Sequence, residues 1–307
     1  MKSILTILFI CISFSLFAQE DEKIYGSIEL DTLTILASNE FDVKTFIQRI
    51  KDDTTFYQAF KNLRYYPHKA IGNLWVYNKR EKEKASEKVD VTQHLKDNKM
   101  WQNHKTISAT GKLRTKKGEY RFTTAEMYYN TFFPVDTIPV STNMTKVKEE
   151  PVGNSKKSKY KHDIKLMMFN PGEDISGVPI VGKKMSIFDD DMVQYYDYKI
   201  SLINYNGIEC YQFSCIAKPE FKEHKTVTKT LVTVFNKETL AVLKREYTMR
   251  YNSILFQFDV SINVINEVKN GIIHPQLIKY KGYWDIPFKR QETITFTIKN
   301  SDYKLID

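Results

Sequence analysis

The chain has 307 residues, of which 42% are hydrophobic and 13% aromatic, enough for one large β-rich domain or two modest ones. Its net charge of +9 is spread over many lysines, a pattern more typical of a solvated surface than of a phosphate-reading site, where arginine forks dominate. We therefore expect no nucleic-acid partner.

The first 19 residues have the three-part order of an export signal. Lys2 supplies a positive charge, residues 4–17 carry no charge, and Glu20 begins an abruptly charged segment. The apolar stretch is shorter than the roughly 20 residues that a membrane-spanning helix needs, so cleavage is favoured over a retained anchor helix. We expect 1–19 to be a signal peptide and the mature chain to be secreted to the periplasm or the periphery of the outer membrane.

The strongest helix signals lie between residues 42 and 64. Asp42 can cap a helix whose apolar positions recur with helical spacing, and Asp53 and its neighbours offer a second cap before another such stripe. The pattern predicts a helical hairpin or one broken helix. Its apolar stripe consists of Val43, Phe46, Ile47, Ile50, Phe56, Phe60 and Leu63. The stripe is too aromatic to remain in water and must pack on another element.

Period-two alternation dominates the rest of the chain and predicts strands. From Val193 onward it is continuous and indicates an antiparallel meander with hairpin turns at Asn206-Gly207 and Asn270-Gly271. Earlier in the chain, residues 30–37 could be a first strand, and we expect a strand at 71–77, a solvated turn at 78–105 and a hairpin at 106–127. Long loops are expected at 134–160 and 170–191, with a short strand at 164–168 between them.

These elements predict a mainly β (α+β) fold. Each strand has one apolar and one polar face, which indicates an antiparallel sheet covered on one side only. We expect a curved antiparallel sheet or unclosed β-barrel of nine to eleven strands, with the N-terminal helix packed on its apolar face. Residues 20–40 would be an N-terminal extension and 41–307 a single half-barrel domain, although the loop at 134–160 could divide it. A small closed outer-membrane β-barrel alternates in the same way but is less expected with an amphipathic N-terminal helix.

No catalytic constellation is recognisable. The six histidines show no His-Glu-x-x-His spacing, and neither a Gly-x-Ser-x-Gly elbow nor a phosphate-binding glycine loop occurs. We expect no enzyme activity, no cofactor and no metal site, and we interpret the acidic run at 189–191 as solvated. Cys210 and Cys215 lie five residues apart on one strand, about 16 Å if extended, and are expected to be buried thiols on opposite faces.

The apolar strand faces are rich in Tyr, Phe and Met, which leaves two interpretations. One is a wide concavity that binds an apolar ligand such as a lipid or the acyl chain of a lipoprotein, since aromatic and methionine side chains suit large irregular pockets. The other is a solid core in a structural or interaction module that holds another envelope protein through its loops. For the first, the candidate ligand-binding residues are Tyr198, Phe213, Tyr247, Phe256 and Phe258 on strands, with Phe46, Ile50 and Phe60 as a helical lid.

Three motifs in the C-terminal half resemble the outer-membrane lipoprotein carrier and sorting (LolA-like) superfamily. They are the Asn-Gly turn with aromatic re-entry at 206–211, the hairpin at 234–244, and Gly-Tyr-Trp-Asp-Ile-Pro at 282–287. The order of helix before strands is also similar. The resemblance implies an unclosed β-barrel with helices in an apolar concavity and a role in carrying lipoproteins or sensing envelope stress. The whole chain also resembles secreted proteins of Bacteroidota, whose signal peptides often end in Phe-Ala-Gln.

The export signal generates a direct prediction. Protein recovered from the envelope fraction should begin at Gln19 or Glu20, because signal peptidase removes the apolar segment. N-terminal sequencing measures this, and a chain that retains Met1 would contradict the prediction.

Overall fold

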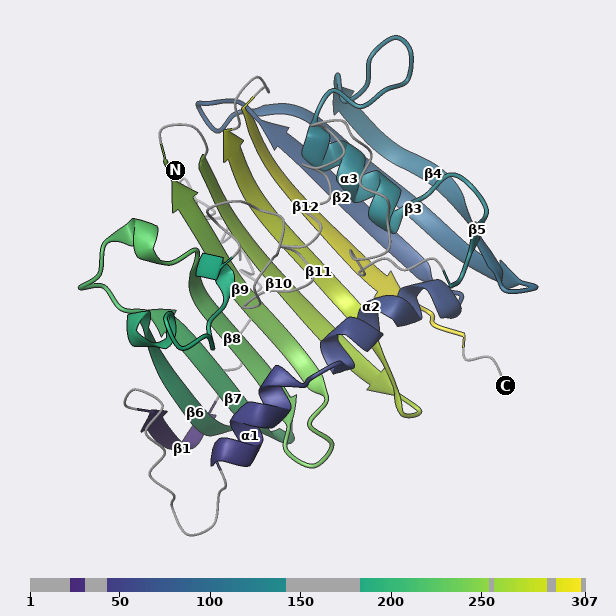
Figure 1. Cartoon of the computed structure of the whole chain (residues 1–307). Coiled ribbons are helices and arrows are strands. Elements are labelled where there is room, and N and C mark those ends of the chain that lie inside the picture. The colour runs from purple at the N-terminus through teal and green to yellow at the C-terminus, as the bar shows by residue number, and fades with distance from the viewer. Residues whose placement is uncertain (1–22, 31–42, 142–182, 254–256, 286–290, 305–307) are drawn as a thin grey trace, which may run out of the picture.

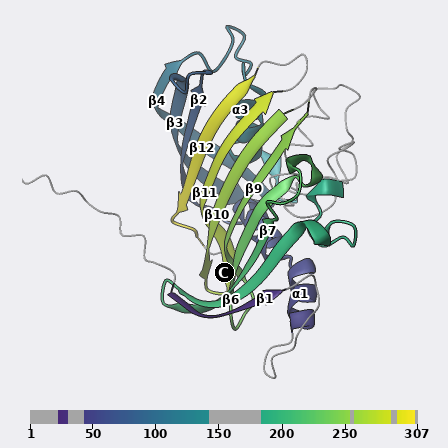
Figure 2. The same ribbon diagram turned by 90° about the vertical axis from the view of Figure 1, so that its left-hand side faces the viewer.

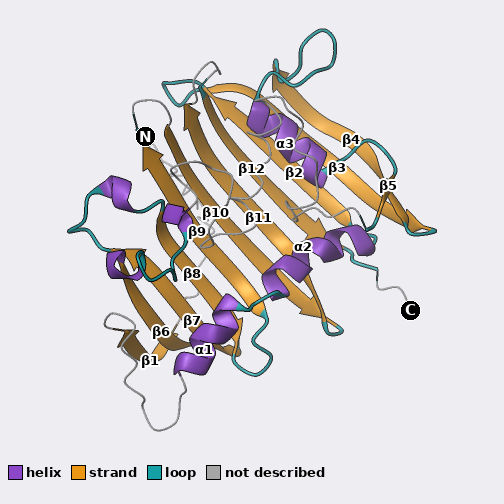
Figure 3. Cartoon of the chain, in the orientation of Figure 1, coloured by secondary structure: helices purple, strands orange, loops and turns teal. Residues whose placement is uncertain are grey.

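The computed structural model describes residues 23–30, 43–141, 183–253, 257–285 and 291–304. Within these residues twelve strands form a single antiparallel sheet in the order β1-β6-β7-β8-β9-β10-β11-β12-β2-β3-β4-β5 (Figures 1 and 3). The sheet is open, because β1 and β5 lie at its two ends and do not pair with each other. The expected unclosed antiparallel sheet is confirmed, with more strands than the nine to eleven expected.

The elements have the following bounds. The strands are β1 Lys23–Leu30, β2 Lys69–Tyr77, β3 Glu83–Lys96, β4 Lys99–Gly111, β5 Ile138–Pro139, β6 Tyr196–Tyr205, β7 Ile208–Ala217, β8 Thr228–Asn236, β9 Val242–Asn252, β10 Gln257–Lys269, β11 Ile272–Asp285 and β12 Glu292–Ser301. The helices are α1 Val43–Lys51, α2 Thr55–Tyr65 and α3 Thr123–Phe132. The predicted broken helix at 42–64 is thus confirmed as α1 and α2.

Strands β6 to β12 follow one another in chain order, as the alternation predicted. Both residues of each Asn-Gly turn have positive φ, 51° and 82° at Asn206-Gly207 and 50° and 76° at Asn270-Gly271. Two successive positive φ values are what the tightest hairpin turn requires, and asparagine and glycine tolerate them best. These two turns therefore determine the register of the meander on either side.

The position of α1 and α2 follows from the sheet order. β1 pairs with β6 near one end of the sheet, whereas β2 pairs with β12, six strands further along the sheet. The chain between β1 and β2 must therefore cross the sheet, and α1 and α2 lie across its concave face (Figures 1 and 2). The prediction that this helical segment packs on the apolar face is confirmed.

The concave face carries the core. Alternate residues of β6 to β12, β2 and β3 are buried in one contiguous apolar cluster together with the inward side chains of all three helices. Representative buried members on the sheet are Tyr198, Phe213, Tyr247, Phe258, Tyr280 and Phe296. The opposite face is largely polar, as shown by Thr293, Thr295 and Thr297 of β12. One side of the sheet therefore holds almost all the apolar surface that folding removes from water.

Two expectations in the N-terminal half are wrong. The interval 78–105, expected as a solvated turn, contains β3 and half of β4. β3 alternates correctly, but polar Glu87 and Gln93 occupy two of its buried positions and hide the pattern. The hairpin expected at 106–127 is also wrong: its first half belongs to β4, which pairs with β3, and its second half leads into α3. The turn at Gly118, with a φ of 84°, is nevertheless present.

Sequence reasoning missed α3 because the helix lacks a local start signal. Its N-cap residue is Phe122, which makes no side-chain capping bond, whereas Ser, Thr, Asp or Asn would be usual. Gly72 of β2 explains how closely α3 approaches the sheet. A Cβ at this position would lie 2.5 Å from the Tyr128 hydroxyl and 2.6 Å from the Phe133 ring. A residue without a side chain therefore lets α3 rest on the backbone of β2.

Several smaller expectations are settled or lie outside the described residues. Cys210 and Cys215 are buried thiols on opposite faces of β7, as predicted. β1 begins earlier than the strand suggested at 30–37, most of which lies outside the described residues, as does the strand expected at 164–168. No helix in the described part of the chain is long and apolar enough to span a membrane.

Candidate functional site

A row of stacked aromatic side chains crosses the middle of the concave face. We call it the aromatic ladder; its members are Tyr251 of β9, Phe258 of β10, Trp284 and Tyr280 of β11, Phe296 of β12 and Tyr128 of α3. Ring centroids are 6.3 Å apart for Tyr251 and Phe258, and 5.0 Å for Phe258 and Trp284. They are 4.6 Å apart both for Tyr280 and Phe296 and for Phe296 and Tyr128. The ladder forms a continuous apolar track over four strands.

The ladder is held in shape by a bond between two of its own members. The Trp284 indole nitrogen donates a hydrogen bond of 2.7 Å to the Tyr280 hydroxyl, which satisfies a polar atom buried in the core. The Tyr280 ring lies over Gly282, where a Cβ would come within 2.1 Å of its hydroxyl. The glycine, tryptophan and tyrosine of this segment therefore act together to lay an aromatic ring flat along the sheet.

The structure brings seven of the eight predicted ligand-binding residues into the same apolar cluster. Tyr247 and Phe258 lie at its centre, and Tyr198 and Phe213 lie on β6 and β7. The helical residues make different contacts. Phe46 of α1 packs on Tyr211 of β7 and Phe235 of β8, at centroid distances of 5.1 and 5.8 Å, whereas Phe60 packs against Phe56 within α2. Ile50 is partly buried against the cluster. Phe256 lies outside the described residues.

Polar contacts attach α2 to the sheet at its start. Asp53 accepts hydrogen bonds from the backbone N–H and hydroxyl of Thr55, at 2.9 and 2.7 Å, and so caps the helix. Its second oxygen lies 3.3 Å from Arg245 of β9, whose guanidinium also lies 4.3 Å from the centre of the Phe56 ring. Further along, the Asn62 amide donates to the carbonyl of Ile273. These contacts give α2 one position over β9 to β11.

A carboxylate from a distant strand supplies the missing cap of α3. Glu292 of β12 accepts hydrogen bonds from the backbone N–H groups of Thr123 and Thr124, at 2.6 and 3.0 Å. Burial raises the pKa of Glu292, while these two N–H groups oppose the rise. The helix dipole also favours a negative charge at this end. A tertiary contact thus replaces the local capping residue that sequence reasoning looks for.

A second contact fixes the middle of α3 to β3. Glu87 of β3 is buried and accepts a hydrogen bond from the Tyr129 hydroxyl and two from Arg114, at 3.1 and 3.2 Å. The Arg114 guanidinium lies over the Tyr120 and Tyr129 rings, which stack on each other with their centroids 5.0 Å apart. The buried carboxylate that obscured β3 in the sequence therefore serves to hold α3.

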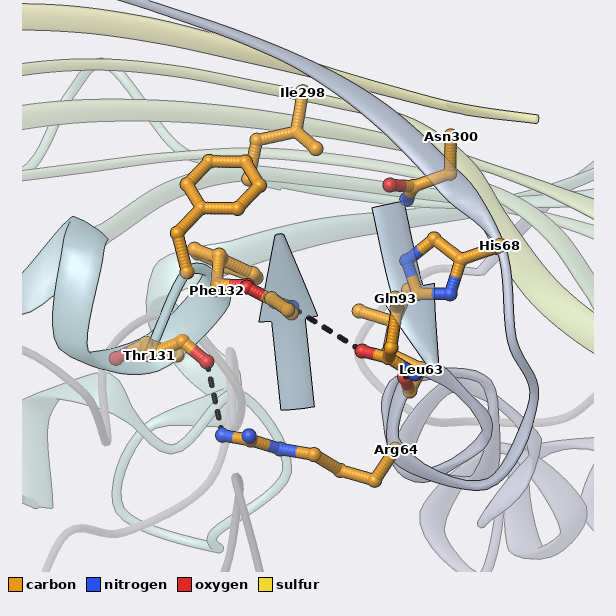
Figure 4. A pocket seen from close by; sticks show the side chains of 10 residues that line it. Leu63, Arg64, His68, Gln93, Thr131, Phe132, Ile298 and Asn300 are labelled. Atoms are coloured by element: carbon orange, nitrogen blue, oxygen red, sulfur yellow. Dashed lines mark hydrogen bonds between the residues drawn. The ribbon is translucent and has the colours of Figure 1, made fainter. Parts of the chain in front are cut away.

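The C-terminal ends of α2 and α3 meet at a small pocket (Figure 4). Arg64 of α2 donates a hydrogen bond of 3.0 Å to the carbonyl of Thr131, and Gln102 of β4 donates one of 3.0 Å to the carbonyl of Phe132. The pocket has a volume of about 10 Å³, which is enough for about one water molecule. The lining residues are Leu63, Arg64, His68, Gln93, Gln102, Thr131, Phe132, Phe133, Ile298 and Asn300.

The described histidines make structural contacts. His68 bonds to the carbonyl of Tyr66 through Nδ1 at 2.9 Å, His94 to Asn103 and His104 to Gln102, and none of these partners is a nucleophile. His68 and His274 both lie against Tyr303, with ring centroids 4.8 and 3.8 Å from the tyrosine ring. Among the described residues no group of three or more His, Cys, Asp or Glu is placed to hold a metal ion.

Comparison with known proteins adds little to this geometry. No protein-family model and no curated protein matches the sequence. Among solved structures, a DUF1329 family protein from Desulfovibrio piger is 12% identical, with 82% of this chain and 91% of that chain covered at a TM-score of 0.25. A domain from Vibrio parahaemolyticus, described as an outer membrane lipoprotein-sorting protein, is 9% identical, with 83% and 92% covered at a TM-score of 0.26. This second match is of the kind that the sequence motifs resemble, but both TM-scores are low, so fold and site rest on this chain's own geometry.

The burial of His68 predicts a pH-dependent stability. Burial lowers the pKa of His68 from 6.5 to about 4, partly opposed by its bond to the Tyr66 carbonyl and assisted by His274. As the pH falls below about 6.5 the unfolded chain therefore takes up this proton first, so the contribution of His68 to stability is complete above that pH and is lost progressively down to about pH 4. Between about pH 7.5 and 4.5 the loss from this one group should be about 2.5 kcal/mol.

The matched variant is His68→Asn, whose amide can keep the bond to the Tyr66 carbonyl but does not titrate. Urea unfolding of both proteins at the two pH values gives the free energy of unfolding in each case. The wild type should lose more stability than His68→Asn by the stated amount, because all other groups are common to both. Equal losses in the two proteins would show that His68 is not buried as a neutral ring.

Proposed function

We propose that this protein is an exported envelope protein that binds an apolar ligand, a lipid or the acyl chain of a lipoprotein, on the concave face of its sheet, without catalysis. The observation that carries the proposal is the aromatic ladder, an apolar track whose strand residues lie on the four neighbouring strands β9 to β12. An acyl chain lying on this track would gain about 0.8 kcal/mol of binding free energy for each CH2 group removed from water.

The way the helices are attached also supports ligand entry. α1, α2 and α3 are short, separate elements, and contacts such as Asp53 with Arg245 and Arg64 with Thr131 join them to the sheet and to each other. Polar joints of this kind can break and re-form in water at a smaller cost than a continuous aliphatic core, since water can satisfy the separated groups. A chain could therefore enter beneath a helix without unfolding the sheet.

One observation favours a second candidate, the interaction module with a solid core. Phe46, Phe60, Tyr198, Phe213 and Tyr247 are each 5% exposed or less. The pocket between α2 and α3 holds about one water molecule, far below the roughly 300 Å³ at which ligand pockets begin. In this form these five side chains are covered, so a ligand reaches them only if part of their cover moves aside.

Trp284 offers a direct test, because among the three tryptophans it is the one in the ladder. Trp75 lies on the opposite face of β2, and Trp101 stacks on His94 of the neighbouring strand. In a Trp75→Phe, Trp101→Phe double variant, a long-chain alcohol brominated along its chain should quench Trp284 fluorescence saturably. Bromine quenches only on contact, so quenching would place the chain at the ladder.

The matched control is Trp284→Phe, which retains the other two tryptophans and should show no saturable quenching. In parallel, native mass spectrometry of the wild type purified from its own envelope should show an added mass. Solvent extraction and analysis of the extract should identify that mass as lipid. A clean ligand-free mass, together with equal quenching in both variants, would reject the binding proposal and leave the interaction module.

A further inference from the structure

Arg64 differs from every other buried charged side chain described in this protein. It is 6% exposed, and its two partners, the carbonyl of Thr131 at 3.0 Å and the sulfur of Met100 at 3.4 Å, are both uncharged. Its Nε has no hydrogen-bond partner. Arginine is almost never buried without a counter-charge, because an unpaired charge in an apolar interior is costly. The charge of Arg64 therefore needs an explanation.

The other buried charges show what is usual in this chain. Glu87 is paired with Arg114, Asp53 is paired with Arg245, and Glu292 accepts two backbone N–H groups. Arg64 meets only the partial negative charge of the Thr131 carbonyl at the C-terminal end of α3, and burial lowers its pKa to about 10. Among the described residues, these buried carboxylates each have an ion pair or two N–H donors, whereas the Arg64 guanidinium has one carbonyl and no anion.

The pocket beside Arg64 contains no counter-charge either. Its polar walls are neutral and already committed to one another: Gln93 donates to the carbonyl of Leu63 at 2.6 Å, Gln102 to the side chain of Gln93 at 3.2 Å, and Asn300 to the carbonyl of Pro275 at 2.8 Å. His68 is neutral at pH 7 because burial lowers its pKa to about 4. These fixed walls leave Arg64 as the one cationic group lining the pocket (Figure 4).

We propose that this pocket binds one oxyanion group, a carboxylate or a phosphate, whose charge compensates Arg64. The pocket has room for about one oxygen atom beside Arg64, while the rest of the group projects from the mouth. The wall formed by Leu63, Phe132 and Ile298 is apolar, so an alkyl chain attached to the anion would meet compatible surface. The source is either a free small anion or the head group of an acidic amphiphile; the latter deepens the proposed function, whereas the former is independent of it.

Thermal unfolding and calorimetric titration of the wild type and Arg64→Met test the site. At constant ionic strength, replacing chloride by acetate or phosphate should raise the melting temperature of the wild type by a few degrees with a saturable dependence. General salt effects act on both proteins alike, so Arg64→Met, which keeps the length of the side chain without its charge, should show only those. If Arg64→Met does not fold, the wild type is titrated beside Arg64→Lys, which keeps the charge but lacks the planar guanidinium, and Arg64→Lys should bind the anion at least tenfold more weakly.

Acetate, decanoate and decanol separate the two sources, because decanoate shares its carboxylate with acetate and its chain with decanol. A head-group site predicts that the wild type binds decanoate at least tenfold more tightly than either acetate or decanol, and that Arg64→Met binds decanoate and decanol equally. A free-anion site predicts saturable binding of acetate or phosphate, with decanoate bound no more tightly than acetate. The absence of any saturable anion effect in the wild type, or the same effect in Arg64→Met, would overturn the inference. Decanol binding reports on the apolar face alone, so failure of that arm would count against the proposed function and not against the anion site.

Discussion

A wide antiparallel sheet that gathers most of its apolar side chains on one face must have that face covered, and the positions of the helices follow from this requirement. An open twelve-stranded sheet cannot do so by closing on itself, so the cover has to come from other elements. The sheet order provides it, because the chain must cross the concave face to pass from β1 beside β6 to β2 beside β12. Once α1 and α2 lie on the face, their aromatic stripes meet the aromatic positions of the strands.

The cover differs in character from the sheet beneath it. The strands are joined by continuous backbone hydrogen bonds and by the rings of the aromatic ladder, whereas the helices are held by apolar packing on the face and by a few polar contacts. Asp53, Glu87 and Glu292 each hold a helix through a side chain that comes from, or reaches to, a distant strand. Such joints define one position for each helix, yet each can be exchanged for water individually. A rigid sheet under separately attached helices is the arrangement on which the proposed binding of an apolar ligand depends.

Much of the fold follows from local patterns, and the exceptions have a common cause. Alternation located β6 to β12, the Asn-Gly turns set their connections, and helical spacing located α1 and α2. The failures at β3 and α3 arise where a distant residue replaces a local signal. Glu87 occupies a core position because it bonds Tyr129, and α3 begins without a capping residue because Glu292 arrives from β12. Alternation and helical spacing indicate the candidate apolar residues as a set. They do not indicate that Arg64 is buried without a counter-charge, because this depends on how α2 and α3 meet.

If a ligand enters beneath the helices, then α1, α2 and α3 must be able to leave the concave face while the sheet persists. Native-state hydrogen exchange measures this, because it reports the opening free energy of each amide. We expect amides of α1, α2 and α3 to exchange through local openings with less protection than those of β9 to β12, and a long-chain apolar ligand to change the protection of the helices selectively. Helices and central strands that exchange together, only through global unfolding and without response to the ligand, would show that the helices do not open separately.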